Sequence, residues 1–459
     1  MKKLTALLSL LFVLAFSSAA FAYEVHDGPT GVIKYAKGKT YDGYTIITPS
    51  PSGDTHITYL INMEGDIVHT WDTSGAGREF PFVSQLLPSG NLLVYTALSK
   101  SPVGIGGYTG LLEELDWDGK VVWSYEMCTE NEVSHHAFDR MPNGNTLILG
   151  WEKVSAAEMA KKGRNPGTFP ESVMMGGKPL TDFWVDFVRE VDRDGKTVWE
   201  WHVMDHVGTG SKQFDPNYIL PEKVGLPYAS YDWTHFNTCQ YIPETDQIIL
   251  NSRNFSETYI IDKKTGAMVF RWGNPSAYGQ GARPAWYDNG DQQIFGSHHA
   301  APIGNGVVSI FDNGSERAEG QRSRVVEVDT KTGDVVWEYH AMGYNSFFSY
   351  RQGGAQKLPN GNYLVTSSQQ GHLFEVTLAK EVVWEFVNPL MDGKSAGIFS
   401  DRADVLMAGG NPVKNMFNNM IHRAYRYGAD YPGLQGKDLT PKGHIVKGYP
   451  KFLDVWQPL

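Results

Sequence analysis

Three histidine-bearing segments and one arginine carry the side chains of this chain that are best suited to chemistry. The segments read SHHAFDRMPNGN, DWTHFNTCQYIPETD and GSHHAAPIGNG, and they contain His136, His235 and the pair His298–His299. Arg253 follows His235 by 18 residues. Imidazole can act as a nucleophile, an acid–base group or a metal ligand, and guanidinium binds oxyanions. Together these residue types suggest a pocket for a tetrahedral oxyanion, with Asn237 as a further polar ligand.

A recurring phrase indicates which elements position these side chains. It has six copies, GDIVHTW, GKVVWSY, GKTVWEW, GAMVFRW, GDVVWEY and KEVVWEF, which begin at Gly65, Gly119, Gly195, Gly266, Gly333 and Lys380. Most follow a β-rich run and an Asp-Gly or Thr-Gly turn, which is typical of a β-hairpin. We expect the repeated tryptophans to pack between neighbouring units.

A second phrase alternates with the first. LPSGNLLVY, MPNGNTLIL and LPNGNYLVT are strand–turn–strand patterns, and IPETDQIIL and PIGNGVVSIF occupy the same position in their units. Two hairpins make four strands, which is the content of one propeller blade. The sequence therefore predicts an all-β, six-bladed β-propeller, with seven blades as the main alternative. Its first blade is expected within residues 43–71.

The three histidine segments each come just before the second phrase of a unit. The strand that enters a propeller blade lines the central channel, so equivalent positions on successive blades converge on the axis. We therefore expect His136, His235 and one of His298 and His299 to share one channel mouth with Arg253. Two alternatives remain: each histidine could be an ordinary buried polar residue, or the cluster could bind zinc or copper. Arg253 and the lack of similarly spaced acidic residues or cysteines count against a metal.

The ends of the chain indicate export and closure. Residues 1–22 have a lysine-containing start, an apolar run and the triplet Ala20-Phe21-Ala22, as in a secretory signal peptide. Residues 23–400 form the predicted propeller with its channel site, and residues 401–459 are expected to complete a blade or wrap the rim. We expect a periplasmic protein without stable membrane insertion, because no later stretch of roughly 18 residues is apolar.

Charge and cysteine content limit the possible partners. The formal net charge is −11, which argues against non-specific binding of nucleic acid. There are only two cysteines, Cys128 and Cys239, and the sequence leaves open whether they form a disulfide.

On these residues the chain resembles the exported arylsulfate sulfotransferases that work without a phosphoadenosine-type donor. The resemblance runs from YDGYTIITPSPSG to HRAYRYGADYPGLQGKDLTP and is strongest around the three histidine segments and in RWGNP. It implies a six-bladed propeller that moves a sulfuryl group from an aryl sulfate to a phenolic acceptor through a sulfated histidine. It implies no cofactor and no metal.

The resemblance also implies roles for single residues. His299 matches the nucleophile, while His136, His235, Asn237 and Arg253 match residues that bind the sulfuryl group. His298 remains a rival for the nucleophile. The chain has no Gly-x-x-x-x-Gly-Lys-Ser/Thr loop for a nucleotide and no Cys/Ser-x-Pro-x-Arg segment of the sulfatase type.

Two other function classes remain open at this stage. The first is a metal- or quinone-dependent propeller oxidoreductase, and the second is a non-catalytic ligand-binding propeller. The sequence does not predict the physiological donor and acceptor or the oligomeric state.

Overall fold

The computed structural model describes residues 30–49, 56–169, 173–175, 178–218, 231–285, 287–343, 346–391, 394–395 and 419–446. The predicted signal peptide and most of residues 401–459 lie outside the described residues. No helix within these ranges is long and apolar enough to cross a membrane.

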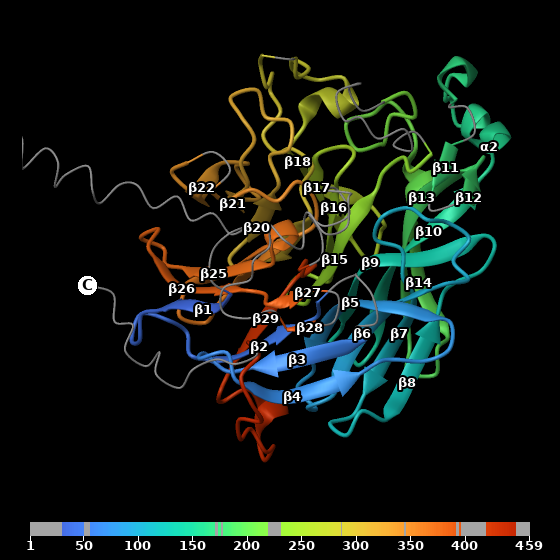
Figure 1. Ribbon diagram of the computed structural model, residues 1–459. Helices are drawn as coiled ribbons and strands as arrows, with labels where there is room; N and C mark the ends of the chain where they lie inside the picture. Colours follow the sequence, from blue (N-terminus) through green and yellow to red (C-terminus); the bar gives the residue numbers. More distant parts are fainter. Residues whose placement is uncertain are drawn as a thin grey trace, which may run out of the picture.

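Six antiparallel sheets of at least four strands form the six blades of a propeller (Figure 1). Blades 2 and 3 contain β5 (Arg78–Leu86), β6 (Leu92–Leu98), β7 (Gly110–Leu115) and β8 (Val121–Glu126), then β9 (Glu132–Arg140), β10 (Thr146–Val154), β13 (Phe183–Val191) and β14 (Thr197–His202). Blades 4 and 5 contain β15 (Phe236–Ile242), β16 (Gln247–Ser252), β17 (Glu257–Asp262) and β18 (Met268–Trp272), then β19 (His299–Pro302), β20 (Val307–Asp312), β21 (Arg324–Asp329) and β22 (Val335–Tyr339). The prediction of six blades is confirmed, and the seven-bladed alternative is wrong.

The remaining two blades join the two ends of the chain. Blade 6 contains β23 (Gly354–Lys357), β24 (Tyr363–Ser367), β25 (His372–Val376) and β26 (Val382–Val387), and β1 (Gly31–Tyr35) pairs with β26 as a fifth strand. Blade 1 contains β2 (Gly43–Ile47), β3 (Ile57–Ile61) and β4 (Ile67–Asp72), and its inner strand is β29 (Tyr425–Gly428) from the far end of the sequence. Figure 1 shows β29, in red, beside β2, in blue.

Small elements decorate these blades. They are the helix α2 (Ala156–Lys161), the hairpin of β11 (Val173–Met175) with β12 (Lys178–Leu180), and the two-residue strands β27 (Leu390–Met391) and β28 (Lys394–Ser395). A capping box on Ser155 starts α2, because the Ser155 side chain accepts from the backbone of Glu158 while the Glu158 carboxylate accepts from the backbone of Ser155.

A ring of tryptophan hydrogen bonds joins each blade to the next. The Nε1–H of the tryptophan on each outer strand donates to a carbonyl in the last hairpin turn of the following blade, over 2.9–3.0 Å. The six bonds are Trp71 to Asp116, Trp123 to Arg193, Trp199 to Lys263, Trp272 to Gly333, Trp337 to Leu378 and Trp384 to Met63. The last bond joins blade 6 to blade 1, so the tryptophans of the repeated phrase link all six blades in a closed ring.

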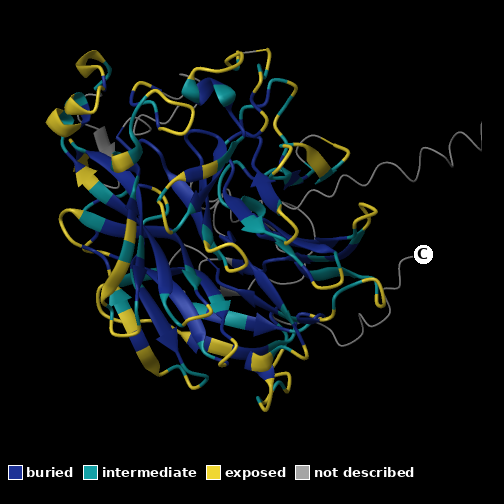
Figure 2. Ribbon diagram, turned by 180° about the vertical axis from the view of Figure 1, so that it is seen from behind, coloured by how far each residue is buried: buried dark blue, intermediate teal, exposed yellow. Residues whose placement is uncertain are grey.

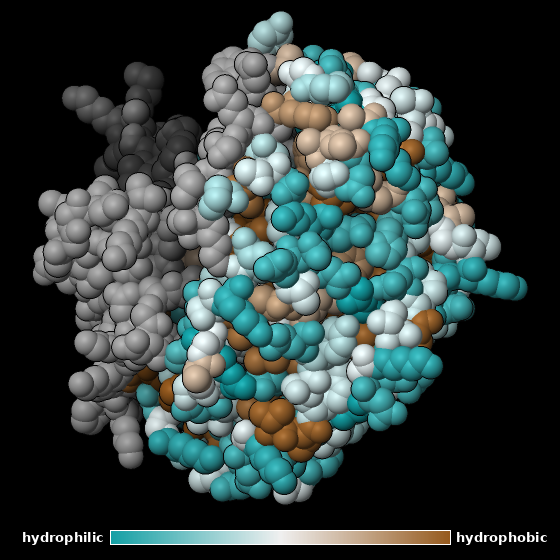
Figure 3. Space-filling view, turned by 90° about the vertical axis from the view of Figure 1, so that its right-hand side faces the viewer, coloured by the Kyte–Doolittle hydropathy of each residue, from teal (hydrophilic) through white to brown (hydrophobic). Residues whose placement is uncertain are grey.

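The apolar core lies between the blades, and exposed residues gather at turns and loops (Figure 2). On the face seen in Figure 3, apolar residues form small, separate patches within a mainly hydrophilic surface. Cys128 and Cys239 are both buried and are not bonded to each other. The core therefore does not depend on a disulfide between them.

A buried ion pair reinforces the closure between blades 1 and 6. Arg426 of β29 has its Nη1 2.5 Å from Glu375 Oε2, donates through Nε to Thr45 Oγ1 over 3.0 Å, and lies 4.2 Å above the Trp384 ring. Glu375 also accepts from Tyr41 N over 2.7 Å. Tyr41, near the start of the propeller, and Arg426, near its end, therefore contact the same buried carboxylate.

Replacement of Arg426 by methionine should lower the free energy of unfolding by about 3–5 kcal/mol, because it leaves Glu375 buried without its cation. Urea unfolding followed by tryptophan fluorescence would measure this loss. The second change Glu375→Gln should recover part of it.

A matched control is the exposed pair of Lys39 and Glu381, which also connects the N-terminal segment to blade 6. Lys39→Met should change the free energy of unfolding by less than about 1 kcal/mol. An equal effect of the two single changes would show that burial of the Arg426 pair is not what stabilises the closure.

Candidate active site

Side chains from four inner strands gather where those strands begin. His136 lies within β9, His235 directly precedes β15, His298 directly precedes β19, and His422 lies shortly before β29. All four side chains are buried. The antiparallel order makes the inner strands run in one direction along the channel, so these positions are at the same end.

Ring contacts show that the cluster is compact. The ring centroids of His136 and His235 are 4.7 Å apart, and those of His136 and His422 are 6.2 Å apart. Phe82 of β5 lies 4.0 Å from the His422 ring and closes this side of the group. The sequence-based expectation that His136 and His235 share one channel mouth agrees with this geometry.

Local backbone irregularities aim two of these histidines. His136 has φ 50° and His235 has φ 48°, and register shifts occur beside both positions in their blades. Non-glycine residues adopt such angles at a cost of about 1–3 kcal/mol. Gly107 provides the space that His136 needs, since a Cβ on Gly107 would lie 2.0 Å from His136 Cε1.

The protonation of the His298 ring is determined by its partners. Its Nδ1 lies 2.8 Å from the Gly296 carbonyl oxygen and 2.9 Å from Asn313 Oδ1. The Asn313 amide nitrogen donates to the carbonyls of Ser349 and Gln352, so its oxygen is the atom that faces the ring. Both groups that face Nδ1 are acceptors, so Nδ1 carries the hydrogen and Nε2 keeps the lone pair.

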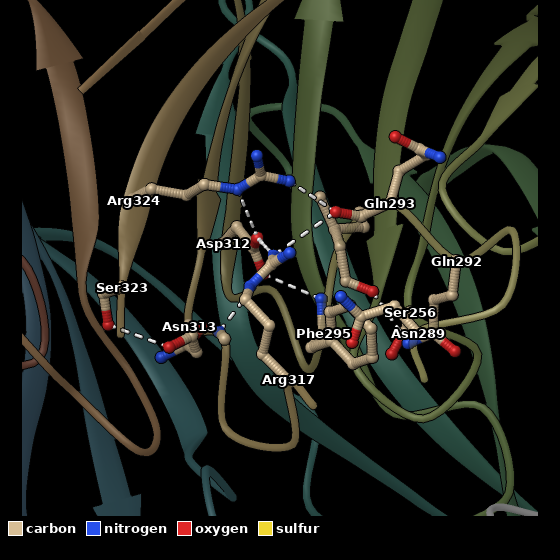
Figure 4. A network of polar contacts seen from close by, with 12 residues as sticks. Ser256, Asn289, Gln292, Gln293, Phe295, Asp312, Asn313, Arg317, Ser323 and Arg324 are labelled. Carbon is tan, nitrogen blue, oxygen red and sulfur yellow. Dashed lines mark hydrogen bonds and ion pairs between the residues drawn. The ribbon is translucent and has the colours of Figure 1, made fainter. Parts of the chain in front are cut away.

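A polar network behind Asn313 holds this arrangement (Figure 4). Asp312 receives hydrogen bonds from the side chains of Arg317 and Arg324 and from Phe295 N, the last over 2.7 Å. Arg324 and Arg317 also donate to the Gln293 carbonyl. The segment that leads into His298 is thus tied to the adjacent loop of the same blade.

His299 makes different contacts. Its Nδ1 accepts from the backbone N–H of Ala355 in blade 6 over 3.3 Å, and its Nε2 lies 3.4 Å from the Gln240 amide of blade 4. Both ring nitrogens are therefore occupied by neighbouring blades. His298 lies near His136, His235 and His422, whereas His299 lies near His422.

Two carboxylates anchor histidines of the cluster. Asp232 accepts from His235 Nδ1, and Asp186 Oδ1 lies 3.1 Å from Nε2 of His135, the residue before His136. A ring nitrogen that donates to a carboxylate leaves the other ring nitrogen with the lone pair. Sequence reasoning did not identify these two acids or His135.

Two buried arginines supply positive charge. Arg253 hydrogen-bonds to Asn254 Oδ1 over 3.0 Å, and Arg423 donates to the His298 carbonyl over 2.8 Å. No carboxylate in the described part of the chain forms an ion pair with either. Burial is the larger cause that lowers the pKa of His298, and the nearby Arg253 lowers it further. Both guanidinium groups can therefore bind an anion.

Asn237 contacts the protein around the site. Its amide nitrogen donates to the Ser297 carbonyl over 3.2 Å, and Asn251 donates to the same carbonyl over 3.1 Å. The two amides fix the backbone immediately before His298. The Asn237 side-chain oxygen has no hydrogen-bond partner among the described residues.

Burial keeps most of these imidazoles neutral. It is the main cause that places the pKa values of His136, His298, His299 and His422 well below the ordinary value, and nearby positive groups add to it. Arg423 is the second cause for His422. Within the described residues, no group of three or more His, Cys, Asp or Glu side chains is arranged to hold a metal ion.

His422, Arg423 and Phe82 also escaped the sequence analysis. His422 and Arg423 precede an inner strand that has no repeat phrase of its own. Phe82 lies in the inner strand of blade 2, at the place where blades 3 and 4 carry histidine. If β29 had been recognised as an inner strand, an alignment of the six inner strands would have pointed to His422.

The fold is a propeller, and buried imidazole and guanidinium groups lie together at one end of its inner strands. Residues 176–388 match the arylsulfotransferase (ASST) family. The matched segment contains His235, Arg253 and His298. The recognition made from the sequence motifs is confirmed.

Other comparisons are more distant. No curated protein matches the chain. Among solved structures, it is similar to a protein of unknown function from Bacteroides caccae, with 11% identity over 83% of this chain and 98% of that chain and a TM-score of 0.47. It is also similar to a catalytically inactive virginiamycin B lyase from Staphylococcus aureus with quinupristin, with 7% identity over 76% and 86% and a TM-score of 0.38.

The lowered pKa values predict that acid destabilises the fold. Below the unfolded-state pKa of about 6.5, the unfolded chain takes up protons that the buried imidazoles cannot accept, so stability falls as the pH falls. Replacement of His422 by asparagine should reduce this slope by up to about 1.4 kcal/mol per pH unit. Urea unfolding at pH 5, 6, 7 and 8 would measure it.

His202 serves as a control of opposite sign. Its hydrogen bond to Glu152 raises the pKa of His202, so it adds stability below the unfolded-state pKa and loses this contribution as the pH rises. His202→Asn should therefore steepen the acid-side decline. Identical pH slopes for wild type and His422→Asn would contradict the interpretation of His422.

Proposed function

We propose that the enzyme transfers a sulfuryl group from an aryl sulfate to a phenolic acceptor by way of Nε2 of His298. The observation that carries this proposal is the fixed ring of His298. Two acceptors hold its Nδ1–H, which leaves a lone pair on Nε2 beside the buried Arg253.

The charges suit a sulfate ester. Such an ester is a monoanion, and a neutral imidazole can approach its sulfur without electrostatic repulsion. Arg253 and Arg423 provide two buried positive charges for the sulfuryl oxygens. Trp151 Nε1 and Arg423 Nε are buried donors without a hydrogen-bond partner among the described residues, and they are further candidates to bind these oxygens.

The proposed reaction has two half-reactions. The His298 Nε2 lone pair forms a bond to sulfur while the S–O bond to the aryl group breaks, and the electron pair leaves with the phenolic oxygen. The acceptor oxygen then attacks sulfur, and the N–S bond electrons return to Nε2. Arg253 stabilises the oxygens as charge develops on them.

His298 takes the role that the resemblance suggested for His299. His299 offers no lone pair, since its Nδ1 accepts from Ala355 N and its Nε2 lies against Gln240. We propose that His299 instead links blades 4, 5 and 6. His136 and His235 keep their proposed role around the sulfuryl group, and Asn237 positions the Ser297 backbone.

Export to the periplasm is also a proposal. It rests on residues 1–22 of the sequence, which lie outside the described residues. A non-catalytic ligand-binding propeller and a metal- or quinone-dependent oxidoreductase are the competing functions, and the labelling experiment below separates them from sulfuryl transfer.

His298→Asn should abolish transfer, whereas His299→Asn should retain it. Asparagine keeps a donor near the Nδ1 position of His298 but has no nucleophilic nitrogen, and at residue 299 its oxygen can still accept from Ala355. After incubation with donor alone, mass spectrometry should find about 80 Da on His298 of the wild type. Label on His299 would restore the earlier assignment, and transfer without any label would favour direct passage from donor to acceptor.

Arg253→Gln should lower turnover by on the order of 10²–10³ without unfolding the protein, as expected for loss of one preorganised charge. Arg253→Lys keeps the charge but not the forked geometry, so its loss should be smaller. Steady-state rates with 4-nitrophenyl sulfate and phenol would measure both. Equal rates for wild type and Arg253→Gln would remove Arg253 from the mechanism.

A further inference from the structure

An arginine near the end of the propeller contacts the backbone of the proposed nucleophile. Arg423 lies two residues before β29, in residues 419–428, which form the closing segment of blade 1. Its Nη2 donates to the carbonyl oxygen of His298 over 2.8 Å, and both residues are buried. Since His298 belongs to blade 5, this bond joins two blades that are separated in the ring by blade 6.

The backbone around Arg423 is fixed to blade 6. The His422 carbonyl accepts from Gly353 N over 3.1 Å, and Ala424 N donates to Thr366 Oγ1 over 3.1 Å. One hydrogen bond on each side of Arg423 thus connects the closing segment to this blade. The side chain of Arg423 therefore starts from a defined place against blade 6.

A glycine leaves free the path that the Arg423 side chain takes. A Cβ on Gly354 of β23 would have three Arg423 atoms as its nearest neighbours, Nε at 2.8 Å, Cδ at 3.0 Å and Cγ at 3.1 Å. These distances are shorter than the optimal separation of about 3.5–4.0 Å between non-bonded carbon atoms. A larger residue at this position would push the arginine aside, so Gly354 is what lets the guanidinium cross blade 6.

Building on the proposed transfer through His298, we propose that Arg423 is a positioning residue for the nucleophile, because it fixes the His298 backbone from the closing segment. The ring of His298 is held separately, by the Gly296 carbonyl and Asn313 Oδ1. The nucleophile thus has its full set of contacts only when the closing segment is docked on blade 6. A misplacement of about 1 Å can lower a rate by on the order of 10², so this backbone contact is important for attack on sulfur.

The chemistry of the guanidinium suits this role. Hydrogen bonds from a charged donor are stronger than those between neutral groups, and the rigid planar fork of arginine keeps its donors in a fixed geometry. The charge of Arg423 also acts on the neighbouring rings. Burial is the main cause that lowers the pKa values of His299 and His422, and Arg423 is the second cause for both.

Replacement of Gly354 by alanine tests this role without removing any functional group. The methyl group should displace the Arg423 guanidinium from the His298 carbonyl while the charge of the arginine is retained. We expect the rate at which saturating 4-nitrophenyl sulfate adds mass to His298 to fall by on the order of 10². The donor concentration that gives half of the maximal labelling rate should change by less than about 3-fold, because donor binding is not what is lost.

A double-mutant cycle shows whether Gly354 acts through Arg423. Arg423→Met removes the donor and should lower the labelling rate at least as far as Gly354→Ala does. Gly354→Ala should then have no further effect in the Arg423→Met background, because no guanidinium is left to displace. The same cycle with Arg423→Lys serves if the methionine variant does not fold. Losses that multiply in the double variant, or a wild-type rate for Gly354→Ala, would overturn the proposal.

Gly167→Ala is the matched control. A Cβ on Gly167 would have atoms of Asn165 as its three nearest neighbours, at 3.3 Å or more. This variant should keep the wild-type labelling rate and the wild-type free energy of unfolding. An equal loss of labelling in Gly167→Ala and Gly354→Ala would show a general effect of added methyl groups and would overturn the positioning role.

A measurement without donor separates this inference from the proposed function. The imidazole ¹⁵N resonances of His298 should move in Gly354→Ala and should stay in place in Gly167→Ala. Unchanged His298 resonances in Gly354→Ala would overturn the positioning role even in an active enzyme. If these resonances move but the wild type neither gains mass on His298 nor transfers a sulfuryl group, the proposed function fails and the Arg423 contact is only structural.

Discussion

Six tryptophan hydrogen bonds form a closed ring around the propeller and hold its blades in place. Each bond links an outer strand to the last turn of the next blade, and the bond from Trp384 to the Met63 carbonyl closes the circle between the two ends of the chain. A propeller without that closure would expose the edges of blades 1 and 6. With it, the six inner strands start at one level around the channel, and side chains from distant parts of the sequence meet there.

Charge pairing distinguishes the channel from the scaffold. Several arginines buried in the scaffold have a carboxylate partner, as in the pairs Arg426–Glu375 and Arg271–Glu257. Arg253 and Arg423 have none among the described residues, and carboxylates at the site contact histidines instead. Unpaired buried charge is destabilising by itself. Its presence next to neutral imidazoles is physically reasonable if a bound anion completes the balance.

The sequence predicted the blades well because each blade repeats its own turn chemistry. His136 and His235 were found because both precede a turn phrase by a similar distance. The closing strand was not assigned, since Tyr425–Gly428 belongs to a blade whose other strands lie more than 350 residues earlier. His422 and Arg423 were missed for the same reason. The choice between His298 and His299 depends on strand register, because adjacent residues point to opposite faces. No repeat phrase determines that register.

His298 and His235 differ in what anchors their rings, and this difference suits the sulfuryl transfer proposed above. A nucleophile in a two-step transfer must also be a good leaving group, because the N–S bond has to break again. An imidazole anchored by a carboxylate would stabilise the positive charge of its sulfated form and slow that second step. His298 is anchored by a carbonyl and an amide oxygen, which are neutral. His235 has the Asp232 carboxylate beside it. The neutral anchors of His298 therefore suit a group that must release sulfur again, whereas the carboxylate beside His235 fixes a ring that stays in place around the sulfuryl oxygens.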